Sequence, residues 1–424
     1  MSAIIIIGAG EAGVQAALTL RQLDSLSSIT LLGDEPGLPY ERPPLSKQCL
    51  LDNTDAPAIS GSQSFSELDI HYRSGETVVA IDRPAHQIEL ASGERLPYDK
   101  LLLATGASAR PLTVAGLEPQ RILTLRTRAD AERIRSQARP GQHVVLAGAG
   151  FISLELAASL RHLGLEVTVL EAAGRILQRA LPASISQRIA AEHQQQGVKI
   201  RCNTRIEQGK AIRRPNPTGV QGQPATQDLA CQLQLNDGSW LEADWLLAGI
   251  GSVPNTTLAA RAGLTIDNGI QVDQHLRTSD PDIYAAGDCC QFPHPLYQQR
   301  LRLESWRCAR EQGELAALNM LGGQHVYQAA PWFWSDQYQL GLQMVGMPIG
   351  IEREIVRNEG DGTRLVFLLD GQQQLKAVCG IGPGNRIARD IKLAERLLNQ
   401  GIHPAASDLS DATVSLKQLL KAGA

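Results

Sequence analysis

Residues 4–18 read IIIIGAGEAGVQAAL and join an apolar run to three glycines in the spacing G-x-G-x-x-G. The run predicts a buried strand over residues 3–7, and the pattern after the glycines predicts a helix that continues to about Leu23. The stretch SITLLGDE, residues 28–35, supplies a second strand. Strand, glycine turn, helix and strand together form a βαβ unit, so the chain belongs to the α/β class.

The glycine turn is suited to a dinucleotide. Its small residues let backbone N–H groups close on a pyrophosphate at the helix N-terminus. They are Gly8, Gly10, Ala12 and Gly13. An acid after the second strand can hold a ribose diol, and Asp34 and Glu35 occupy that place. A chance turn is the alternative, but strand, helix, strand and acid in this order favour the nucleotide site.

The same order returns in VVLAGAGFISLELAASL, residues 144–160, which predicts a helix to about Leu163 and is followed by the strand EVTVLEA. Gly148 and Gly150 fill the first two glycine positions, and Ser153 occupies the third. Serine is small enough for the helix to pack tightly on the strand. One chain is therefore predicted to hold two dinucleotides.

Glu171 ends the second strand of this unit and follows Gly148 by 23 positions, close to the roughly 20 typical of a ribose-binding acid. Its carboxylate accepts hydrogen bonds from ribose hydroxyls and repels a 2′-phosphate. We therefore expect NADH in preference to NADPH. Arg175 is the nearby positive charge that could weaken this preference.

Glu155 needs a separate explanation, because a carboxylate in the opening turns of this helix would repel a pyrophosphate. It follows Phe151 and Ile152 by four and three positions and shares with them a helix face that we expect to be buried. A solvated helix residue is the alternative.

The composition excludes several classes of protein. The 424 residues are 43% hydrophobic and 20% charged, which suits three folded domains without a long disordered tract. A net charge of −4 argues against a general nucleic-acid binder. The apolar run at residues 3–7 is far too short for a membrane span. Seven cysteines without a C-x-x-C pair suit a cytoplasmic protein with reduced thiols, and we expect no metal site.

Two further strand ends are predicted beside the first glycine turn. YDKLLLATGASARPL, from residue 98, breaks into a turn at Thr105 and Gly106, and PDIYAAGDCCQF, from residue 281, ends at Gly287 and Asp288. Asp288 could accept hydrogen bonds from polyol hydroxyls, or it could merely cap the next turn.

Two other regions differ in pattern from these units. Residues 207–230 lose periodicity among Pro, Gly, Asn and Gln and predict a long exposed loop between strands. Beyond about residue 326, strand-like runs such as GLQMVG, RLVFLL and KAVCGI are accompanied by an amphipathic helix near RIARDIKLAERLLNQG. This pattern predicts a separate α+β domain.

The sequence resembles the FAD-dependent NADH:ferredoxin reductases that serve Rieske-type aromatic-ring dioxygenases and class I cytochrome P450 systems. These enzymes are glutathione-reductase-like two-dinucleotide flavoproteins. The likeness runs nearly end to end. Its most specific parts are LPYERPPLSK (38–47), LLATGASARPL (102–112), GAGFISLE (148–155), AAGDC (285–289), RLESW (302–306) and PWFWSDQY (331–338).

This resemblance implies FAD on the first glycine turn and NADH on the second, each in a Rossmann-like domain. It also implies a discontinuous FAD-binding domain, residues 1–112 and 241–325, with an NAD-binding domain inserted at 113–240. Residues 326–424 are then the C-terminal α+β domain.

The resemblance further implies site residues. In the resembling enzymes the lysine of the first motif pairs with the glutamate of the second glycine turn, next to flavin N5, and these positions are Lys47 and Glu155 here. A cation there would stabilise negative charge on the reduced ring. Trp306 is expected against the flavin, and Trp334 at the surface where an electron leaves. The remaining implied contacts with FAD or NADH are Arg42, Pro44, Val78, Thr105, Gly106, Arg110, Arg126, Phe151, Ile152, Gly251, Gly287 and Asp288.

The expected activity is electron transfer. The related disulfide reductases carry a redox cysteine pair just after the first βαβ unit, whereas this chain has only Cys49 nearby. The flavin is then the working group: NADH gives up a hydride, and electrons leave singly to an acidic [2Fe–2S] ferredoxin that feeds a terminal oxygenase.

Several points stay open at this stage. An NADH oxidase, a peroxide-directed or disulfide-directed flavoenzyme, and a redox-responsive flavoprotein resembling apoptosis-inducing factors are the alternative functions. Scattered arginines could steer an acidic partner or could merely face solvent. They are Arg42, Arg300, Arg302, Arg307 and Arg310. We expect a monomer or a weak homodimer.

Overall fold

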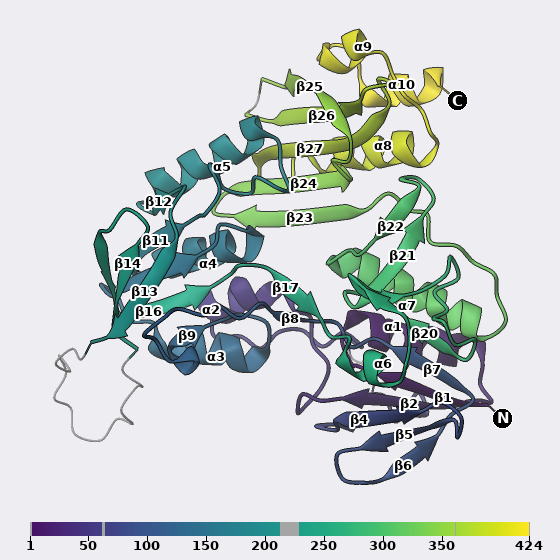
Figure 1. Ribbon diagram of the computed structural model, residues 1–424. Helices are drawn as coiled ribbons and strands as arrows, with labels where there is room; N and C mark the ends of the chain where they lie inside the picture. Colours follow the sequence, from purple (N-terminus) through teal and green to yellow (C-terminus); the bar gives the residue numbers. More distant parts are fainter. Residues whose placement is uncertain (1, 62–63, 213–228, 361, 424) are drawn as a thin grey trace. The chain divides into compact units, whose positions relative to one another are not determined.

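The computed structural model describes residues 2–61, 64–212, 229–360 and 362–423. The chain divides into two compact units, each assembled from separate stretches of sequence. The first unit comprises Met1–Glu41, Pro57–Ser108 and Val253–Phe333; the second comprises Arg42–Ala56, Ala109–Ser252 and Trp334–Ala424. The division falls within three strands, β8 (Ala107–Ala109), β17 (Ser252–Pro254) and β23 (Trp332–Gln337). Figure 1 labels the elements.

In its described residues, the first unit contains a parallel sheet, smaller sheets and three helices. Its elements are β1 (Ala3–Ile7), α1 (Glu11–Leu23), β2 (Ser28–Gly33), β3 (Ile70–Ser74), β4 (Val78–Asp82), β5 (Gln87–Leu90), β6 (Arg95–Pro97), β7 (Lys100–Leu103), α6 (Thr257–Arg261), β18 (Ile266–Asp267), β19 (Gly269–Gln271), β20 (Ile283–Ala285), β21 (Cys290–His294), β22 (Gln299–Leu301) and α7 (Trp306–Met320).

The central sheet of this unit has the order β20-β7-β1-β2-β3, and its strands are parallel. Ile4 of β1 lies opposite Ile29 of β2 on one side and Lys100 of β7 on the other. Burial on both faces explains the unbroken apolar run, because all four isoleucines from Ile4 to Ile7 are buried. The predicted βαβ unit and the two further strands beside it are confirmed.

The second unit holds another parallel sheet and the C-terminal region. Its N-terminal elements are the short 3₁₀ helix η1 (Pro43–Ser46), α2 (Gln48–Leu51), η2 (Pro119–Arg121), β9 (Ile122–Leu123), α3 (Arg128–Gln137), β10 (His143–Ala147), α4 (Phe151–His162), β11 (Glu166–Leu170), α5 (Ala183–Gln195), β12 (Lys199–Arg201), β13 (Ile206–Ala211), β14 (Cys231–Leu235), β15 (Trp240–Ala243) and β16 (Trp245–Ala248).

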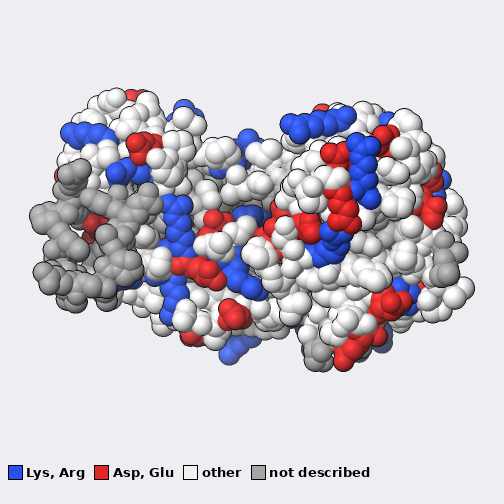
Figure 2. Space-filling view, turned by 90° about the horizontal axis from the view of Figure 1, so that it is seen from below, with Lys and Arg blue, Asp and Glu red and all other residues white. Residues whose placement is uncertain are grey.

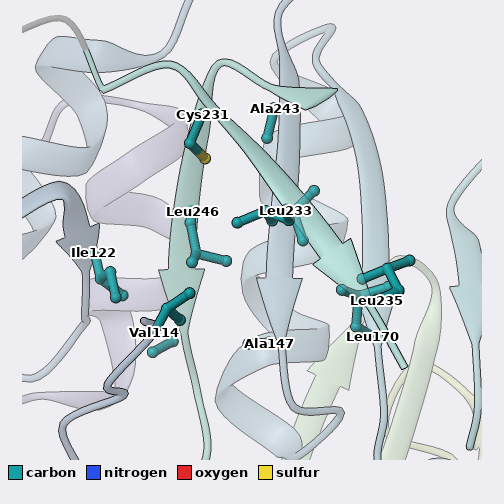
Figure 3. Packing of buried hydrophobic residues seen from close by; sticks show 11 residues of the cluster. Val114, Ile122, Ala147, Leu170, Cys231, Leu233, Leu235, Ala243 and Leu246 are labelled. Carbon is teal, nitrogen blue, oxygen red and sulfur yellow. The ribbon is translucent and has the colours of Figure 1, made fainter. Parts of the chain in front are cut away.

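The parallel sheet of this unit has the order β12-β11-β10-β16-β9, which confirms the second predicted βαβ unit. A three-stranded antiparallel sheet, β13-β14-β15, packs against it. Figure 3 shows the buried contact, in which Leu233 and Leu235 of β14 lie among Ala147, Leu170 and Leu246 of the parallel sheet. This apolar layer fixes the strands that carry the second glycine turn.

The C-terminal region is α+β, as predicted. Its elements are β24 (Leu340–Gly346), β25 (Ile351–Asn358), β26 (Arg364–Asp370), β27 (Leu375–Pro383), α8 (Ala388–Asn399), α9 (Ala406–Ser410) and α10 (Leu416–Ala422). The sheet order is β23-β24-β27-β26-β25. The buried guanidinium of Arg357 donates hydrogen bonds to the carbonyl oxygens of Asp408, Leu409 and Val414, so it ties β25 to the chain around α9.

The predicted loop at 207–230 is partly wrong. Residues up to Ala211 belong to β13, which pairs antiparallel with β14, so the first part of the stretch is a strand. Its polar sequence misled the prediction because β13 is exposed along most of its length. Residues 213–228 lie outside the described residues.

Among the residues that the structure describes, no helix is long and apolar enough to cross a membrane.

Candidate dinucleotide sites and a buried carboxylate

Protein contacts account for two glycines of the first turn. Gly8 has a positive φ of +107°, and a Cβ there would lie 2.2 Å from the carbonyl oxygen of Ala104. A Cβ on Gly13 would lie 1.9 Å from the carbonyl oxygen of Gly8. Both positions therefore need glycine for the turn and the helix to pack.

Gly10 is different. Its φ of −83° is open to any residue, and a Cβ there would meet nothing within 4 Å. In the second turn, Gly148 has a φ of +93° and packs against Gly249, whereas Gly150 has a φ of −78° and its nearest neighbour would be 3.9 Å away. Neither backbone conformation nor internal packing explains Gly10 or Gly150. A group from outside the chain that approaches the backbone closely would explain both glycines, as a pyrophosphate at a helix N-terminus does.

The predicted neighbours of the first turn lie close to it. Thr105 Oγ1 donates a 2.7 Å hydrogen bond to the carbonyl oxygen of Asn255, which fixes the turn after β7. The Gly287 N–H donates to Gln312 Oε1, and a Cβ on Gly287 would lie 3.1 Å from the Cβ of Ala12. Thr105 and Gly287 therefore lie against the turn, and Gly106 and Asp288 follow them at the carboxyl ends of β7 and β20, where ligands of such sheets bind.

Asp34 and Glu35 follow β2 directly, as predicted. The hydroxyl of Tyr40 donates a 2.5 Å hydrogen bond to Glu35 Oε2, so this carboxylate already has one partner. Val78 opens β4, lies opposite Leu90 and is partly exposed. Their contacts with adenosine remain predictions.

Glu11 was missed by the sequence reasoning, although it stands inside the first glycine motif. It begins α1, and burial, followed by the nearby Glu41 carboxylate, raises its pKa to about 7. With this pKa, about half of the Glu11 carboxyls are protonated at pH 7, so on average they repel a pyrophosphate less than a fully ionised carboxylate. Trp306 begins α7, with the Arg310 guanidinium 5.8 Å from its ring centre.

Near the second glycine turn, two backbone N–H groups hold the carboxylate of Glu171. The N–H of Ala149 donates to Oε2 and that of Ala173 to Oε1, both at 2.8 Å. Arg175, the charge that could offset it, donates instead to Ser186 Oγ at 2.9 Å and to the carbonyl oxygen of Gln178 at 3.2 Å. The carboxylate is thus oriented at the end of β11, and the arginine has other partners.

Ser153 replaces the third glycine without loss of close packing. Its buried hydroxyl donates to the carbonyl oxygen of Gly249 at 3.3 Å, and a Cβ on Gly249 would lie 1.9 Å from that hydroxyl. Gly249, which follows β16, leaves room for the Ser153 side chain, so the helix still packs closely on the sheet.

Glu155 lies in the second turn of α4 and is buried, with only 8% of its surface exposed. Lys47 Nζ lies 3.2 Å from Oε1, Ser335 Oγ donates to Oε1 at 2.6 Å, and Ser46 Oγ donates to Oε2 at 2.5 Å. The ion pair implied by the resemblance is therefore present, and the solvated alternative for Glu155 is wrong. The two serines were not anticipated.

The expected cause of the burial of Glu155 was only partly right. Ile152, expected on the same buried face, is 47% exposed, because α4 begins at Phe151 and its first turn is not covered as the second is. Burial of Glu155 comes from the segment around Ser46 and from β23, which the helical pattern could not reveal.

Local sequence fixes the segment that carries Lys47. Pro43 and Pro44 open η1, where their fixed φ angles suit a helical turn. Arg42 Nη1 donates at 2.6 Å to the carbonyl oxygen of Arg126. Arg110 similarly pairs with Gly251 through a 2.9 Å backbone hydrogen bond. These contacts hold the backbone of the second unit, while the predicted cofactor contacts of the same residues stay predictions.

Trp334 is partly exposed on β23, next to the buried Ser335. Its role in electron exit also stays a prediction.

Three of the five arginines proposed to attract an acidic partner have acidic neighbours. Arg302 pairs with Glu304 at 2.5 Å, Arg307 with Glu311 at 2.7 Å and Arg310 with Glu314 at 3.3 Å. Figure 2 shows basic and acidic side chains next to one another on the face that it draws. These three pairs add no net positive charge, which weakens the steering hypothesis.

The thiols offer little for redox catalysis. None of the seven cysteines forms a disulfide. Burial, and next the nearby Asp55, raises the pKa of the Cys49 thiol, which lowers the fraction of reactive thiolate. Within the described ranges, no group of three or more His, Cys, Asp or Glu side chains could hold a metal ion.

Comparison with known proteins identifies relatives over the whole length. The pattern of the pyridine nucleotide-disulphide oxidoreductases matches residues 2–313, and that of the reductase C-terminal region matches 332–420. Rhodocoxin reductase of Rhodococcus erythropolis is 39% identical, with 98% of this chain and 93% of the relative covered. The ferredoxin–NAD⁺ reductase component of the anthranilate 1,2-dioxygenase system of Burkholderia cepacia is 38% identical, with 98% of each covered. The crystal structure of putidaredoxin reductase in covalent complex with putidaredoxin superimposes with a TM-score of 0.89 at 35% identity, covering 100% of this chain and 99% of that one.

Proposed function

We infer that this chain, which belongs to the ferredoxin reductases of the pyridine nucleotide-disulphide oxidoreductase family, passes electrons from NADH through FAD to a [2Fe–2S] ferredoxin. The family implies FAD and NAD(P) as cofactors. We assign FAD to the turn at Gly8–Gly13 and the nicotinamide dinucleotide to the turn at Gly148–Ser153. We also propose the finer domain boundaries, 1–112 with 241–325 for the FAD-binding domain, 113–240 for the NAD-binding domain and 326–424 for the C-terminal domain.

The observation that carries the proposal is the ion pair between the partly buried Lys47 and the buried Glu155. A carboxylate in the opening turns of a nucleotide-binding helix is electrostatically unfavourable for pyrophosphate, so its place needs another function. FAD, when bound, accepts a hydride and releases electrons singly. Lys47 supplies a positive charge that stabilises developing negative charge, and Glu155 fixes the ammonium group in place. We propose that this pair acts where hydride passes from NADH to FAD.

The preference for NADH rests on Glu171. Its carboxylate is oriented by the N–H groups of Ala149 and Ala173 and keeps free lone pairs for ribose hydroxyls. A 2′-phosphate at the same place would meet this negative charge. Arg175 is held by Ser186 and Gln178, which supports discrimination against NADPH.

The electron acceptor is proposed by analogy with the relatives. Rhodocoxin reductase and putidaredoxin reductase are named for their partners, and the anthranilate relative is a dioxygenase component. We propose a ferredoxin that feeds either a Rieske-type oxygenase or a cytochrome P450, with Trp334 near the point of electron exit and Trp306 near the flavin. A cytoplasmic monomer or weak homodimer suits such a diffusing partner.

The decisive experiment is cytochrome c reduction by NADH, with and without candidate ferredoxins. We expect a rate that depends on NADH and on one ferredoxin. Fast NADH oxidation that is independent of every ferredoxin and yields peroxide or water would favour the oxidase alternative. Slow reduction with a long-lived charge-transfer complex would favour the redox-responsive alternative.

A further inference from the structure

Glu155 is the end of a hydrogen-bond network of buried polar side chains. Ser335, which donates to Glu155 Oε1, accepts a 3.0 Å hydrogen bond from Gln337 Nε2. Gln337 Oε1 lies 2.8 Å from Nε2 of His193 on α5, and Nδ1 of the same ring has a longer contact, 3.4 Å, with the hydroxyl of Tyr338. Ser335, Gln337 and His193 are all buried.

The carboxylate of Glu155 fixes which group donates and which accepts in every hydrogen bond of this network. Glu155 pairs with Lys47, and Ser335 donates its hydroxyl proton to Glu155 Oε1. The oxygen of Ser335 then accepts from the NH₂ group of Gln337, and the amide oxygen of Gln337 must face His193. His193 Nε2 therefore carries a proton. Burial lowers the pKa of His193, so the ring is neutral at pH 7, and its Nδ1 is the acceptor.

The geometry of a strand places the network on one side of β23. Ser335 and Gln337 face the interior, while Trp334 and Asp336 alternate with them and are partly or fully exposed. Three buried polar side chains on adjoining elements are costly unless each has its partners, and apolar residues of similar size would avoid the cost. The network ends on Glu155, and its net effect is to aim the Ser335 hydroxyl at that carboxylate.

We propose that Ser335, Gln337 and His193 are positioning residues for the electron-transfer reaction. They hold the Glu155 carboxylate, and through it Lys47, in the orientation needed for hydride transfer. This inference rests on the proposed function of the Lys47–Glu155 pair. It predicts that the strand bearing Trp334 also supports the hydride-transfer step.

The tautomer of His193 offers a test that does not depend on activity. The full-length protein, labelled with ¹⁵N-histidine, contains nine histidines, and the spectrum of His193→Asn identifies the relevant signals. We expect a neutral ring with Nε2 protonated and Nδ1 unprotonated. Ser335→Ala should shift these signals because Gln337 loses its anchor. The opposite tautomer in the wild-type protein would overturn the assigned directions and with them the inference.

Kinetics of the FAD-loaded enzyme separate positioning from simple stability. In anaerobic stopped-flow mixing with NADH, Ser335→Ala should lower the limiting rate of flavin reduction about tenfold, as expected for loss of one hydrogen bond to a charged group, and change the NADH Kd less than about threefold. Ser335→Thr keeps the hydroxyl and should restore most of the rate.

Thr168→Val is the matched control. Like Ser335→Ala, it removes the hydroxyl of a buried residue in the second unit, and Thr168 Oγ1 lies 2.8 Å from Nε2 of His143. Thr168→Val and Ser335→Ala should lower the melting temperature similarly, but Thr168→Val should keep the rate of reduction. Equal rates in Ser335→Ala and wild type, or equal losses in Ser335→Ala and Thr168→Val, would overturn the inference. Failure of NADH to reduce even the wild-type enzyme would instead overturn the proposed function.

Discussion

Replacing Gly10 by alanine should leave the protein folded and weaken its hold on FAD. The added methyl group would meet no protein atom within 4 Å, and the φ of −83° is already accessible to alanine. Alanine loses less backbone entropy on folding than glycine, a gain of about 0.4–1 kcal/mol, but it is a poorer N-cap by roughly 0.5–1 kcal/mol. The unfolding free energy of the apoprotein should therefore change by less than about 1 kcal/mol.

The effect on FAD should be larger. The methyl group would stand in the space through which a pyrophosphate approaches the N–H groups at the start of α1. Loss of one hydrogen bond to a charged group costs about 1.5–3 kcal/mol. That range corresponds to an increase of roughly 10- to 150-fold in the Kd for FAD.

Gly13→Ala provides the contrasting case. Its Cβ would lie 1.9 Å from the carbonyl oxygen of Gly8, where only backbone movement can relieve the clash. This variant should be destabilised by at least the roughly 1–3 kcal/mol typical of overpacking. Thermal unfolding of both apoproteins and fluorescence titration with FAD measure the two effects. Wild-type FAD affinity in a folded Gly10→Ala would refute the argument that the cofactor occupies this space.

Four further outcomes test other parts of the proposal. Glu155→Ala should slow flavin reduction by NADH more than it weakens NADH binding, because the carboxylate orients Lys47; a purely binding defect in stopped-flow titrations would contradict this. NADPH should be a poor substrate, and Glu171→Ala should narrow the ratio of kcat/KM for NADH over NADPH by about tenfold, the effect of roughly 1.4 kcal/mol; equal use of both by the wild type would show the role of Glu171 to be wrong. Cys49→Ser should retain ferredoxin reduction, whereas loss of activity would revive a thiol-dependent mechanism. Because the folded state raises the pKa of Glu11 to about 7 from 4.5, its contribution to apoprotein stability should fall as pH rises from about 4.5 to about 7, so the melting temperature should decline more steeply than in Glu11→Gln; parallel profiles would count against it.

Local patterns were sufficient to predict the elements of the two proposed nucleotide sites. The isoleucine run, the two glycine turns and the acids after the following strands all lie within short stretches, and their periodicity reflects burial on a strand or a helix face. At positions 8 and 148, the positive φ angle and the close approach of a neighbouring carbonyl oxygen are enough to require glycine. Short-range sequence is thus enough to predict the two βαβ units and the class of ligand that each would bind.

Predictions of burial, strand pairing and surface charge were less accurate, because they depend on which other elements pack against a residue. Ile152 is exposed although its helical position suggested burial, and the polar residues up to Ala211 form a strand because β14 pairs with them. The arginines near α7 were considered as a basic surface, but their carboxylate neighbours offset them. Each outcome depends on side chains contributed by another element or on pairing between strands, which periodicity does not record.

The order of residues along the chain is enough to specify the α/β architecture, the two glycine turns and, through resemblance, the pairing of Lys47 with Glu155. The serines that complete this site became evident from the folded chain alone. Ser46 is 109 positions before Glu155 and Ser335 is 180 positions after it, yet both donate to its carboxylate. Their convergence depends on the packing of η1, α4 and β23, because a buried charge selects its partners by distance in space rather than by position along the chain.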